Sequence, residues 1–423
     1  MKFQAPRGTY DILPDEAHKW HYLEKIIRKN AKFFDYKEIR FPIFERLELF
    51  QRGVGKSTDI VEKEMYVFKD KKGRNFALRP EGTASIVRAY IEHNMNSSQK
   101  NPLRLFYFGP MFRYARPQKG RYRQFYQFGF EYIGNPEPIA DAEIIAIGWK
   151  IYQDMKIPNV NLELNSVGCV NCRRKYYKEL KKFLIRKRGN FCSVCQKRMN
   201  SNPMRTFDCK NKNCQNLLNN APIMLENLCP ECESHFQKVL DLLNQMNVKY
   251  NVNSKIVRGL DYYTRTAFEY KIEYLGAQDA IGGGGRYDEL IEYLGGKSTP
   301  AVGLSGGLER IILSLNEAKI DIQNEESLDV FIIPLEEKFV KISIEIMQKL
   351  HKKSISSIIS DSQTSLKNNL KYCDENRVKF AIIIGENEIK SKEFTIKNIN
   401  EKSQKKIPTN EVCEYIFIQL KNN

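Results

Sequence analysis

The chain has 423 residues, 42% of them hydrophobic and 28% charged, and its formal net charge is +17. This length allows two to four domains with separate cores, and the composition is typical of a globular enzyme. No run of about 18 apolar residues is present, which argues against a membrane span. Residues 1–8 lack the apolar stretch of a secretory signal, so we expect a cytoplasmic protein.

The excess of positive charge favours a polyanionic partner, and nucleic acid is the usual one, because phosphate contacts release counterions. A Lys-rich proteome with a solvated basic surface would give the same net charge, and the Lys, Ile and Asn content fits that alternative. Net charge therefore leaves both interpretations open.

Residues 1–165 have the pattern of mixed α/β structure. Helical periodicity covers residues 18–34, and aromatic, alternating sequences predict strands at 103–108 and 124–133. Alternation gives the second strand two different faces. One face, expected to be in the core, carries Tyr126, Phe128, Phe130 and Tyr132. The other face combines an aromatic ring, an amide and a carboxylate around a glycine: Phe125, Gln127, Gly129 and Glu131.

Five basic residues lie from Arg113 to Arg123, in the loop that precedes the second strand. A solvated hairpin would also carry basic residues. The polar strand face beside them favours a site for a nucleotide and a small polar molecule, because arginines neutralise phosphate and fork onto its oxygens.

Residues 166–245 are rich in Cys, Lys and Asn and are predicted to form an inserted module. Eight of the ten cysteines occur here as four closely spaced pairs: Cys169 and Cys172, Cys192 and Cys195, Cys209 and Cys214, and Cys229 and Cys232. Such spacing lets two thiolates face one ion, so the eight are candidate ligands of structural zinc in two tetrahedral sites. Disulfides in a secreted protein, or buried reduced thiols, are the alternatives. The spacing leaves open which pairs share an ion, and His235 is expected at the surface.

Strand and glycine-turn patterns return at 250–318 and end in a helix near 308–315. The four glycines at 282–285 cost backbone entropy, so they mark a tight turn or the close approach of a ligand. A polar linker is expected at 316–327.

The last part of the chain alternates short apolar strands with helices, which predicts a small α/β domain at 328–423. The strands are expected at 330–333, 355–359 and 380–384, and the helices at 336–351 and 364–376.

Several segments together resemble the motifs of class II aminoacyl-tRNA synthetases in their histidyl form. Residues 108–131 resemble motif 2, and 302–310 resemble motif 3. The sequence VRGLDYYT at 257–264 resembles a signature peculiar to histidyl-tRNA synthetases. Residues 78–83 resemble the segment that binds the substrate amino group, and 36–42 resemble motif 1 at the dimer interface. Nearly the whole chain is covered.

The resemblance implies an α+β fold and a homodimer. A class II catalytic domain, an antiparallel sheet flanked by helices, would consist of residues 1–165 and 246–320. The Cys-rich insertion at 166–245 would interrupt it, and an α/β anticodon-binding domain would follow at 328–423. Two residues depart from the family pattern: Asp35 stands where glycine is frequent, and Ala115 where bacterial members often have glutamate.

The activity implied is ATP-dependent ligation of L-histidine to histidine tRNA through a histidyl-adenylate, with Mg²⁺ accompanying ATP. Arg113 and Arg258 are the implied catalytic residues, since fixed guanidinium groups stabilise charge at the α-phosphate. The implied ATP-binding residues are Arg113, Arg121, Phe125 and Arg310. The implied histidine-binding residues are Glu81, Gly82, Thr83, Arg113, Gln127, Glu131, Arg258, Tyr262 and Tyr263.

Within this set, Glu81 would supply negative charge to the substrate ammonium and Thr83 a hydroxyl. Glu131 would form a hydrogen bond with one nitrogen of the imidazole ring, which fixes the tautomer of the ring. Tyr263 would form a hydrogen bond with the other nitrogen. Basic clusters of the insertion at 173–175, 181–182 and 186–188 would suit the tRNA acceptor stem.

Three other functions fit less well. A non-catalytic, histidine-binding regulatory paralogue of histidine biosynthesis would be expected to lack parts of the Arg258 segment and the C-terminal domain, and both are present. A class II enzyme for another amino acid would not need two polar partners for an imidazole. A plain RNA-binding protein would not need Glu81, Gln127 and Glu131 beside phosphate-binding arginines.

Overall fold

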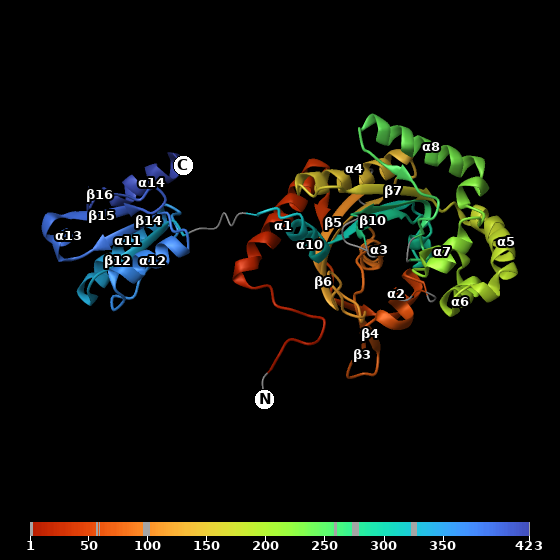
Figure 1. Cartoon of the computed structure of the whole chain (residues 1–423), viewed down its shortest axis with the longest axis horizontal. Coiled ribbons are helices and arrows are strands. Elements are labelled where there is room, and N and C mark those ends of the chain that lie inside the picture. Colours follow the sequence, from red (N-terminus) through yellow and green to blue (C-terminus); the bar gives the residue numbers. More distant parts are fainter. Residues whose placement is uncertain are drawn as a thin grey trace. The chain divides into compact units, whose positions relative to one another are not determined.

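The computed structural model describes residues 3–55, 58, 60–95, 102–257, 260–272, 279–322 and 328–422. The chain forms two compact units, Met1–Ile322 and Gln323–Asn423 (Figure 1). Arg258, one of the implied catalytic residues, lies outside the described residues. No helix in the described part of the chain is both long enough and apolar enough to cross a bilayer.

An eight-stranded sheet forms the centre of the first unit. In spatial order its strands are β1 (Lys37–Glu38), β5 (Leu103–Phe112), β6 (Gln124–Ile133), β11 (Ala301–Gly307), β10 (Ala280–Arg286), β9 (Thr264–Lys271), β7 (Asn161–Ser166) and β8 (Asn251–Val252). Neighbours from β5 to β7 are antiparallel, and the short edge strands β1 and β8 pair in parallel. The antiparallel sheet that the resemblance implies is therefore confirmed, with parallel pairing only at its two edges.

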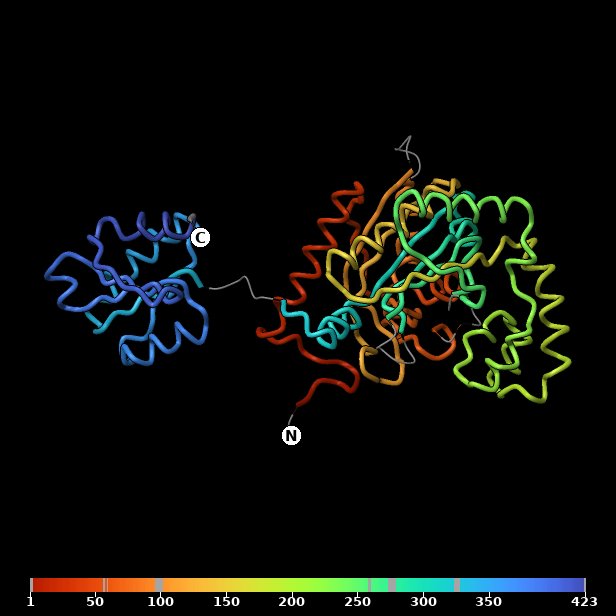
Figure 2. The backbone as a smooth tube through the Cα atoms, turned by 45° about the horizontal axis from the view of Figure 1, so that its top comes forward, coloured from red at the N-terminus to blue at the C-terminus, as the bar shows by residue number. Residues whose placement is uncertain are grey.

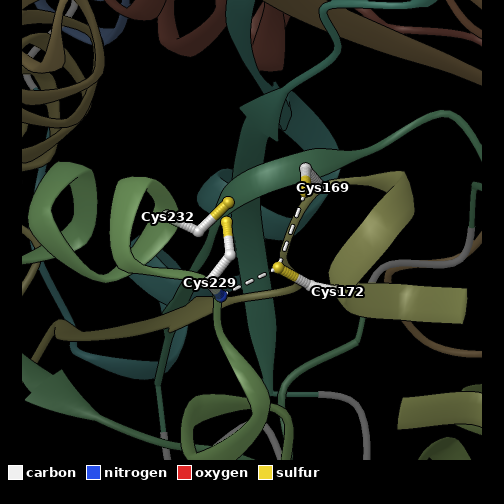
Figure 3. A group of neighbouring side chains, drawn as sticks. All are labelled: Cys169, Cys172, Cys229 and Cys232. Atoms are coloured by element: carbon white, nitrogen blue, oxygen red, sulfur yellow. Dashed lines mark hydrogen bonds between the residues drawn. The ribbon is translucent and has the colours of Figure 1, made fainter. Parts of the chain in front are cut away.

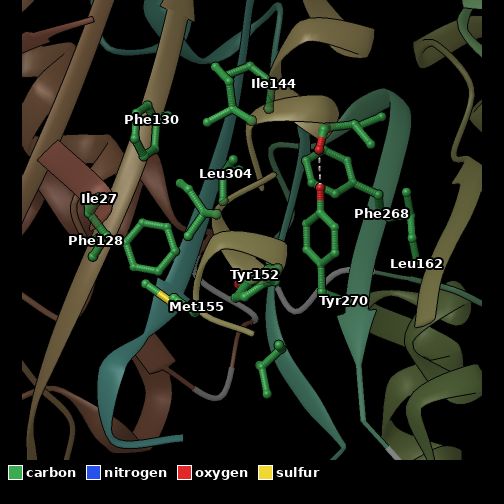
Figure 4. Close-up of a cluster of buried hydrophobic side chains, with 14 of the residues drawn as sticks. Ile27, Phe128, Phe130, Ile144, Tyr152, Met155, Leu162, Phe268, Tyr270 and Leu304 are labelled. Atoms are coloured by element: carbon green, nitrogen blue, oxygen red, sulfur yellow. Dashed lines mark hydrogen bonds between the residues drawn. The ribbon is translucent and has the colours of Figure 1, made fainter. Parts of the chain in front are cut away.

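Helices cover one face of this sheet and form the main core with it. They are α1 (Pro14–Phe33), α4 (Pro138–Asp154), α8 (Pro230–Gln245) and α10 (Leu308–Glu317). The apolar face of β6 contributes Phe128, Phe130 and Tyr132 to this core, and Tyr126 packs against it, as its alternation predicts (Figure 4). The opposite face of β6, with its polar side chains, is left for a site.

A smaller layer lies beside the polar face. It consists of the sheet β2 (Phe44–Arg46), β4 (Asn75–Leu78) and β3 (Val67–Lys69), the helices α2 (Leu47–Gly53), α3 (Thr83–Glu92) and α9 (Leu290–Tyr293), and a π-helical turn, Ile60–Glu64. The cores of this layer include Tyr107 from β5 and Ala77 from β4.

The Cys-rich segment between β7 and α8 forms a group of helices (Figure 2). These helices share a separate hydrophobic cluster with Val257, Tyr263 and Ala267. The helices of the segment are α5 (Val170–Arg186), α6 (Ser193–Ser201) and α7 (Lys212–Leu218), with short helical turns at Arg188–Asn190, Pro203–Asp208 and Met224–Asn227.

The second unit is a five-stranded sheet with helices, so the small α/β domain is confirmed. Its strands are β13 (Ser357–Ile359), β12 (Val330–Pro334), β14 (Phe380–Ile384), β15 (Glu393–Asn398) and β16 (Ser403–Pro408). Its helices are α11 (Val340–Lys352), α12 (Leu366–Glu375), α13 (Glu386–Ser391) and α14 (Val412–Asn422), with a helical turn at Glu337–Phe339. The sequence analysis did not predict β15 and β16. β16 contains two lysines and no buried residue, and β15 has only two buried apolar residues, Phe394 and Ile396, so neither strand contains an apolar run.

Asp35 ends the turn after α1 with φ +58°, in the left-handed region that favours glycine. Asp tolerates this conformation better than most other side chains do, so it can stand at a position where glycine is frequent in the family.

Of the two alternatives for the glycine run at 282–285, the tight turn is wrong, because the run lies in a strand, β10 (Ala280–Arg286). A Cβ atom at Gly284 would lie 1.9 Å from the carbonyl oxygen of Gly303 and 2.8 Å from the Cα atom of Leu304, both on β11. Backbone contact between the two strands therefore requires glycine here.

We predict that Gly284→Ala lowers the free energy of unfolding of the first unit by about 1–3 kcal/mol, because β10 must move away from β11. Urea denaturation followed by circular dichroism measures this. Gly189→Ala is the matched control, since its Cβ atom would meet nothing within 4 Å. Equal stability of both variants would contradict the close approach.

Candidate functional site

A cavity of about 370 Å³ opens on the polar face of the large sheet. This volume lies in the range of small-molecule sites. Its walls include glycine-rich backbone of β10 and β11, among them Gly282, Gly283 and Gly306. Nine residues implied by the sequence line it: Glu81, Thr83, Arg113, Arg121, Phe125, Gln127, Tyr262, Tyr263 and Arg310.

Two further residues implied by the resemblance, Gly82 and Glu131, are among the described residues but do not line the cavity. A Cβ atom on Gly82 would come within 2.4 Å of the Tyr107 ring, so Gly82 packs on that ring. Glu131 is 1% exposed and lies behind two residues of the cavity wall, Thr83 and Tyr287.

The Glu131 carboxylate is held from both sides. The Thr83 hydroxyl donates to Oε1 over 2.8 Å, and the Tyr287 hydroxyl donates to Oε2 over 2.5 Å. Burial raises the pKa of Glu131 to about 8, although these two hydrogen bonds oppose the rise. Only glycine fits at position 303, since a Cβ atom there would lie 1.8 Å from Glu131 Oε2.

Glu81 sits at the start of α3, where the backbone amides of Thr83 and Ala84 donate to its carboxylate over 2.7 and 2.9 Å. Burial raises the pKa of Glu81, while these amides and the nearby Arg113 lower it. Two buried carboxyl groups, Glu81 and Glu131, therefore lie close together, an arrangement suited to a ligand with a cationic or N–H-rich group.

Arginines form the other part of the cavity. Arg113 lies over the Phe125 ring at 5.2 Å, and its Nε donates to the carbonyl of Pro80 over 2.8 Å. Arg121 pairs with Glu64 at 3.1 Å, and Arg310 donates to the carbonyl of Ala280. Burial lowers the pKa of Arg113 and Arg310, a cost of desolvation that a bound anion would offset.

Electrostatic neighbours show how these charges are ordered. The charge of Glu81 raises the pKa of Glu131, and the charge of Arg113 lowers the pKa of Glu81. The charge of Arg121 lowers the pKa of both Arg113 and Arg310. Glu131 and Glu81 thus form an acidic part, and Arg113, Arg121 and Arg310 form a basic part whose lining also contains Glu269 and Glu309.

Sequence reasoning gave no role to Tyr287 or Glu309, which also line the cavity. Glu309 is 6% exposed, and its Oε1 accepts from the amide of Tyr126 over 2.8 Å. Burial raises the pKa of Glu309 to about 7. Its position directly before Arg310 in the motif 3 segment was the available signal.

The eight paired cysteines converge in two groups of four. One contains Cys169, Cys172, Cys229 and Cys232 (Figure 3), and the other contains Cys192, Cys195, Cys209 and Cys214. In each group the sulfur atoms all lie within 4.8 Å of one another. They are free thiols, and the 3.5 Å between the sulfurs of Cys169 and Cys172 far exceeds a disulfide bond of about 2.05 Å. The structure thereby answers which pairs lie together.

The expectation for His235 is wrong, because this residue is only 6% exposed. Its helix α8 buries one face, so His235 points inward with Cys232 and Phe236. His235 Nε2 lies 3.2 Å from Asp141, and Nδ1 lies 3.2 Å from the Arg265 guanidinium.

Comparison with known proteins gives the family. A family model described as histidyl-tRNA synthetase matches residues 8–311, and one described as anticodon binding domain matches residues 329–417. The chain belongs to the histidyl-tRNA synthetase family.

Similar members span almost the whole chain. A histidine–tRNA ligase of Halothermothrix orenii is 46% identical over 407 residues, which cover 96% of this chain and 97% of that protein. One of Desulfitobacterium hafniense is 42% identical over 423 residues and covers 100% of both chains. The apo crystal structure of S. aureus histidyl-tRNA synthetase has a TM-score of 0.84 and 36% identity, and covers 98% of this chain and 100% of that one. These findings confirm the predicted family, the fold class and the anticodon-binding domain, and favour the ligase over the regulatory paralogue.

We predict that Glu131→Gln changes how stability depends on pH. The folded-state pKa of about 8 exceeds the ordinary value of 4.5, so the native state of the wild type binds the extra proton between these values. The wild type therefore loses stability as pH rises from about 4.5 to 8, by roughly 2–5 kcal/mol. The stability of Glu131→Gln does not fall in this way, because the amide does not titrate.

Urea denaturation at several pH values, with the exposed Glu292→Gln as control, measures the difference. If the new amide lowers the free energy of unfolding by the same amount at every pH, the curve of stability against pH is displaced without a change in slope. Parallel curves for Glu131→Gln and the wild type would contradict the raised pKa.

Proposed function

We propose that this protein joins L-histidine to histidine tRNA, through a histidyl-adenylate made from ATP. The observation that carries this proposal is a cavity in which Glu81, with Glu131 directly behind the wall, adjoins Arg113, Arg121 and Arg310, in a chain of the histidyl-tRNA synthetase family. The acidic part suits the amino acid, and the basic part suits a triphosphate.

In the acidic part, Glu81 neutralises the substrate ammonium, and Thr83 and Gln127 help to hold the amino acid. Gly82 shapes this part by packing on Tyr107. When Glu131 is ionised, each of its oxygens accepts one hydroxyl and keeps a second lone pair, so an imidazole N–H can donate to it as well. Tyr263, beside Tyr262, provides the partner for the second ring nitrogen.

In the basic part, the adenine ring stacks on Phe125, Arg121 and Arg310 neutralise the outer phosphates, and Mg²⁺ accompanies them. Arg113 and Arg258 lie at the α-phosphate, where charge develops as the histidine carboxylate attacks and pyrophosphate leaves. In the sequence Arg258 comes directly after Val257 of the insertion core and two residues before Leu260, which lines the cavity. The terminal ribose of tRNA then attacks the acyl carbon, so positioning supplies most of the catalysis.

The domains divide the work on tRNA. Residues 1–165 and 246–320 form the catalytic domain, 166–245 the insertion, and 328–423 the anticodon-binding domain. The basic clusters at 181–182 and 186–188 of the insertion contact the acceptor stem. Arg173 is an exception, because its guanidinium lies against the carbonyl of Tyr263 and Glu289.

We also propose a cytoplasmic homodimer, in keeping with translation as the process served. Lys37 and Glu38 of the motif 1 segment form β1, which is the edge strand of the large sheet among the strands that the structure describes. Exposed aromatic side chains on the small sheet, Phe44 and Phe68, suit a subunit interface.

The cysteines of the insertion are proposed to hold zinc in a structural role. All four positions around each centre are thiolates, so neither group leaves an open position for a substrate.

Amino-acid-dependent exchange between ATP and pyrophosphate tests the activity. We predict exchange with histidine alone among the twenty amino acids, and a loss of about 100-fold or more in Arg258→Ala, since a fixed donor to the reacting oxygens is removed. Arg74→Ala, in an exposed turn paired with Asp70, is the control. Protein that binds histidine but shows no exchange would favour the regulatory paralogue instead.

Glu81→Gln keeps the shape of the side chain and removes its charge. We predict that the KM for histidine rises about 10- to 100-fold while the KM for ATP stays within about twofold, because a charge-assisted hydrogen bond to the ammonium is lost. Steady-state exchange kinetics measure both constants. A rise confined to the KM for ATP would contradict the assignment.

A further inference from the structure

The two cysteine groups lie at different places in the insertion. The junction cluster (Cys169, Cys172, Cys229 and Cys232) joins the first residues of α5 to the first residues of α8, the two ends of the insertion. The distal cluster (Cys192, Cys195, Cys209 and Cys214) joins α6 to α7 inside it. Each cluster therefore fixes a different part of the module.

The geometry of both clusters fits a tetrahedral zinc ion. Zinc–sulfur bonds of about 2.3 Å place the four sulfurs about 3.8 Å apart. The sulfurs of Cys169 and Cys172 lie 3.5 Å apart, and those of Cys192 and Cys209 lie 3.7 Å apart.

Backbone amides further favour thiolates at both places. The amide of Cys229 donates to the sulfur of Cys172 over 3.1 Å, and the amide of Cys192 donates to that of Cys214 over 3.3 Å. Cys169, Cys192 and Cys229 each precede the first residue of a helix, where the helix dipole stabilises negative charge.

One hydrogen bond connects the neighbourhood of each cluster to the cavity wall at 260–263. Arg173, the residue after Cys172, donates through Nη1 to the carbonyl oxygen of Tyr263 over 2.8 Å. Asn202, at the end of α6, donates through Nδ2 to Asp261 Oδ1 over 2.8 Å. Asn202 is itself held by the hydroxyl of Tyr177 from α5.

The apolar contacts of this wall belong to the insertion as well. Val257, Tyr263 and Ala267 are buried in the same hydrophobic cluster as Cys172 and Cys195, and Leu260 and Tyr262 pack against that cluster. Since Leu260, Tyr262 and Tyr263 line the cavity, the insertion supports one wall of the proposed histidine site.

We propose that the insertion binds two zinc ions, one in each cluster, and that the ions position the wall at 260–263 for histidine through Arg173 and Asn202. Metal binding would then stabilise the fold of the module, because thiolate sites release their binding energy on folding. The kinetic part of this inference rests on the proposed histidine activation, and the metal part does not.

Elemental analysis of the full-length protein, purified in reducing buffer without added metal, tests the sites directly. We expect two zinc ions per chain, one for each cluster, and one fewer in Cys172→Ser and in Cys195→Ser. Cys373→Ser, in the second unit, is the matched control and retains both ions. Cobalt exchange should give thiolate charge-transfer bands in the wild type. One ion or none in the wild type overturns the proposal.

Arg173→Ala and Asn202→Ala test the positioning without touching a ligand. We expect both variants to keep two zinc ions and to raise the KM for histidine about 10-fold, with the KM for ATP unchanged, as for the loss of one well-placed hydrogen bond. Lys178→Ala, an exposed residue of α5, is the control. An unchanged KM for histidine in both variants overturns the positioning role. Absence of all exchange in the wild type would instead contradict the proposed function and leave the zinc count standing.

Discussion

The alternation of side chains along β6 is the constraint on which the rest of the first unit depends. Phe128, Phe130 and Tyr132 must enter the helical core, so Phe125, Gln127 and Glu131 necessarily face the other side. A shift of one residue in the register would exchange the two faces. The pairing of β6 with β5 and β11 therefore fixes both the core and the polar face of the cavity.

A buried polar network ties the helical layer to the same sheet. Arg286, at the end of β10, is 0% exposed and pairs with Asp141 of α4. Burial works against ionisation of Asp141, but Arg286 and His235 lower its pKa to about 2. His235 in turn meets Arg265 on β9. Because an unpaired charge at this depth would be costly, the four side chains hold α4, α8 and two strands in one arrangement.

The cavity and the insertion are linked through the short segment at 260–263. On the side of α2, the amide of Asp261 donates to the carbonyl of Val54 over 3.4 Å, and Gly55 leaves room for the Asp261 side chain, since a Cβ atom there would lie 2.7 Å from Asp261 Oδ2. On the insertion side, Arg173 and Asn202 donate to the same segment. The segment therefore has contacts with both modules, which gives the Cys-rich insertion a structural connection to the wall of the cavity.

The sequence by itself determined the family, the alternating faces of β6, the α/β character of the last part of the chain and nine of the residues that line the cavity, because these depend on local periodicity and on contiguous motifs. Tertiary structure alone decided which cysteines share a centre, since pairs from helices distant in the sequence meet only after folding. It also decided that His235 is buried, that Glu131 lies behind Thr83 and Tyr287, and that Tyr287 and Glu309 reach the cavity. Those outcomes depend on packing between elements far apart along the chain, which the sequence around each residue does not specify by itself.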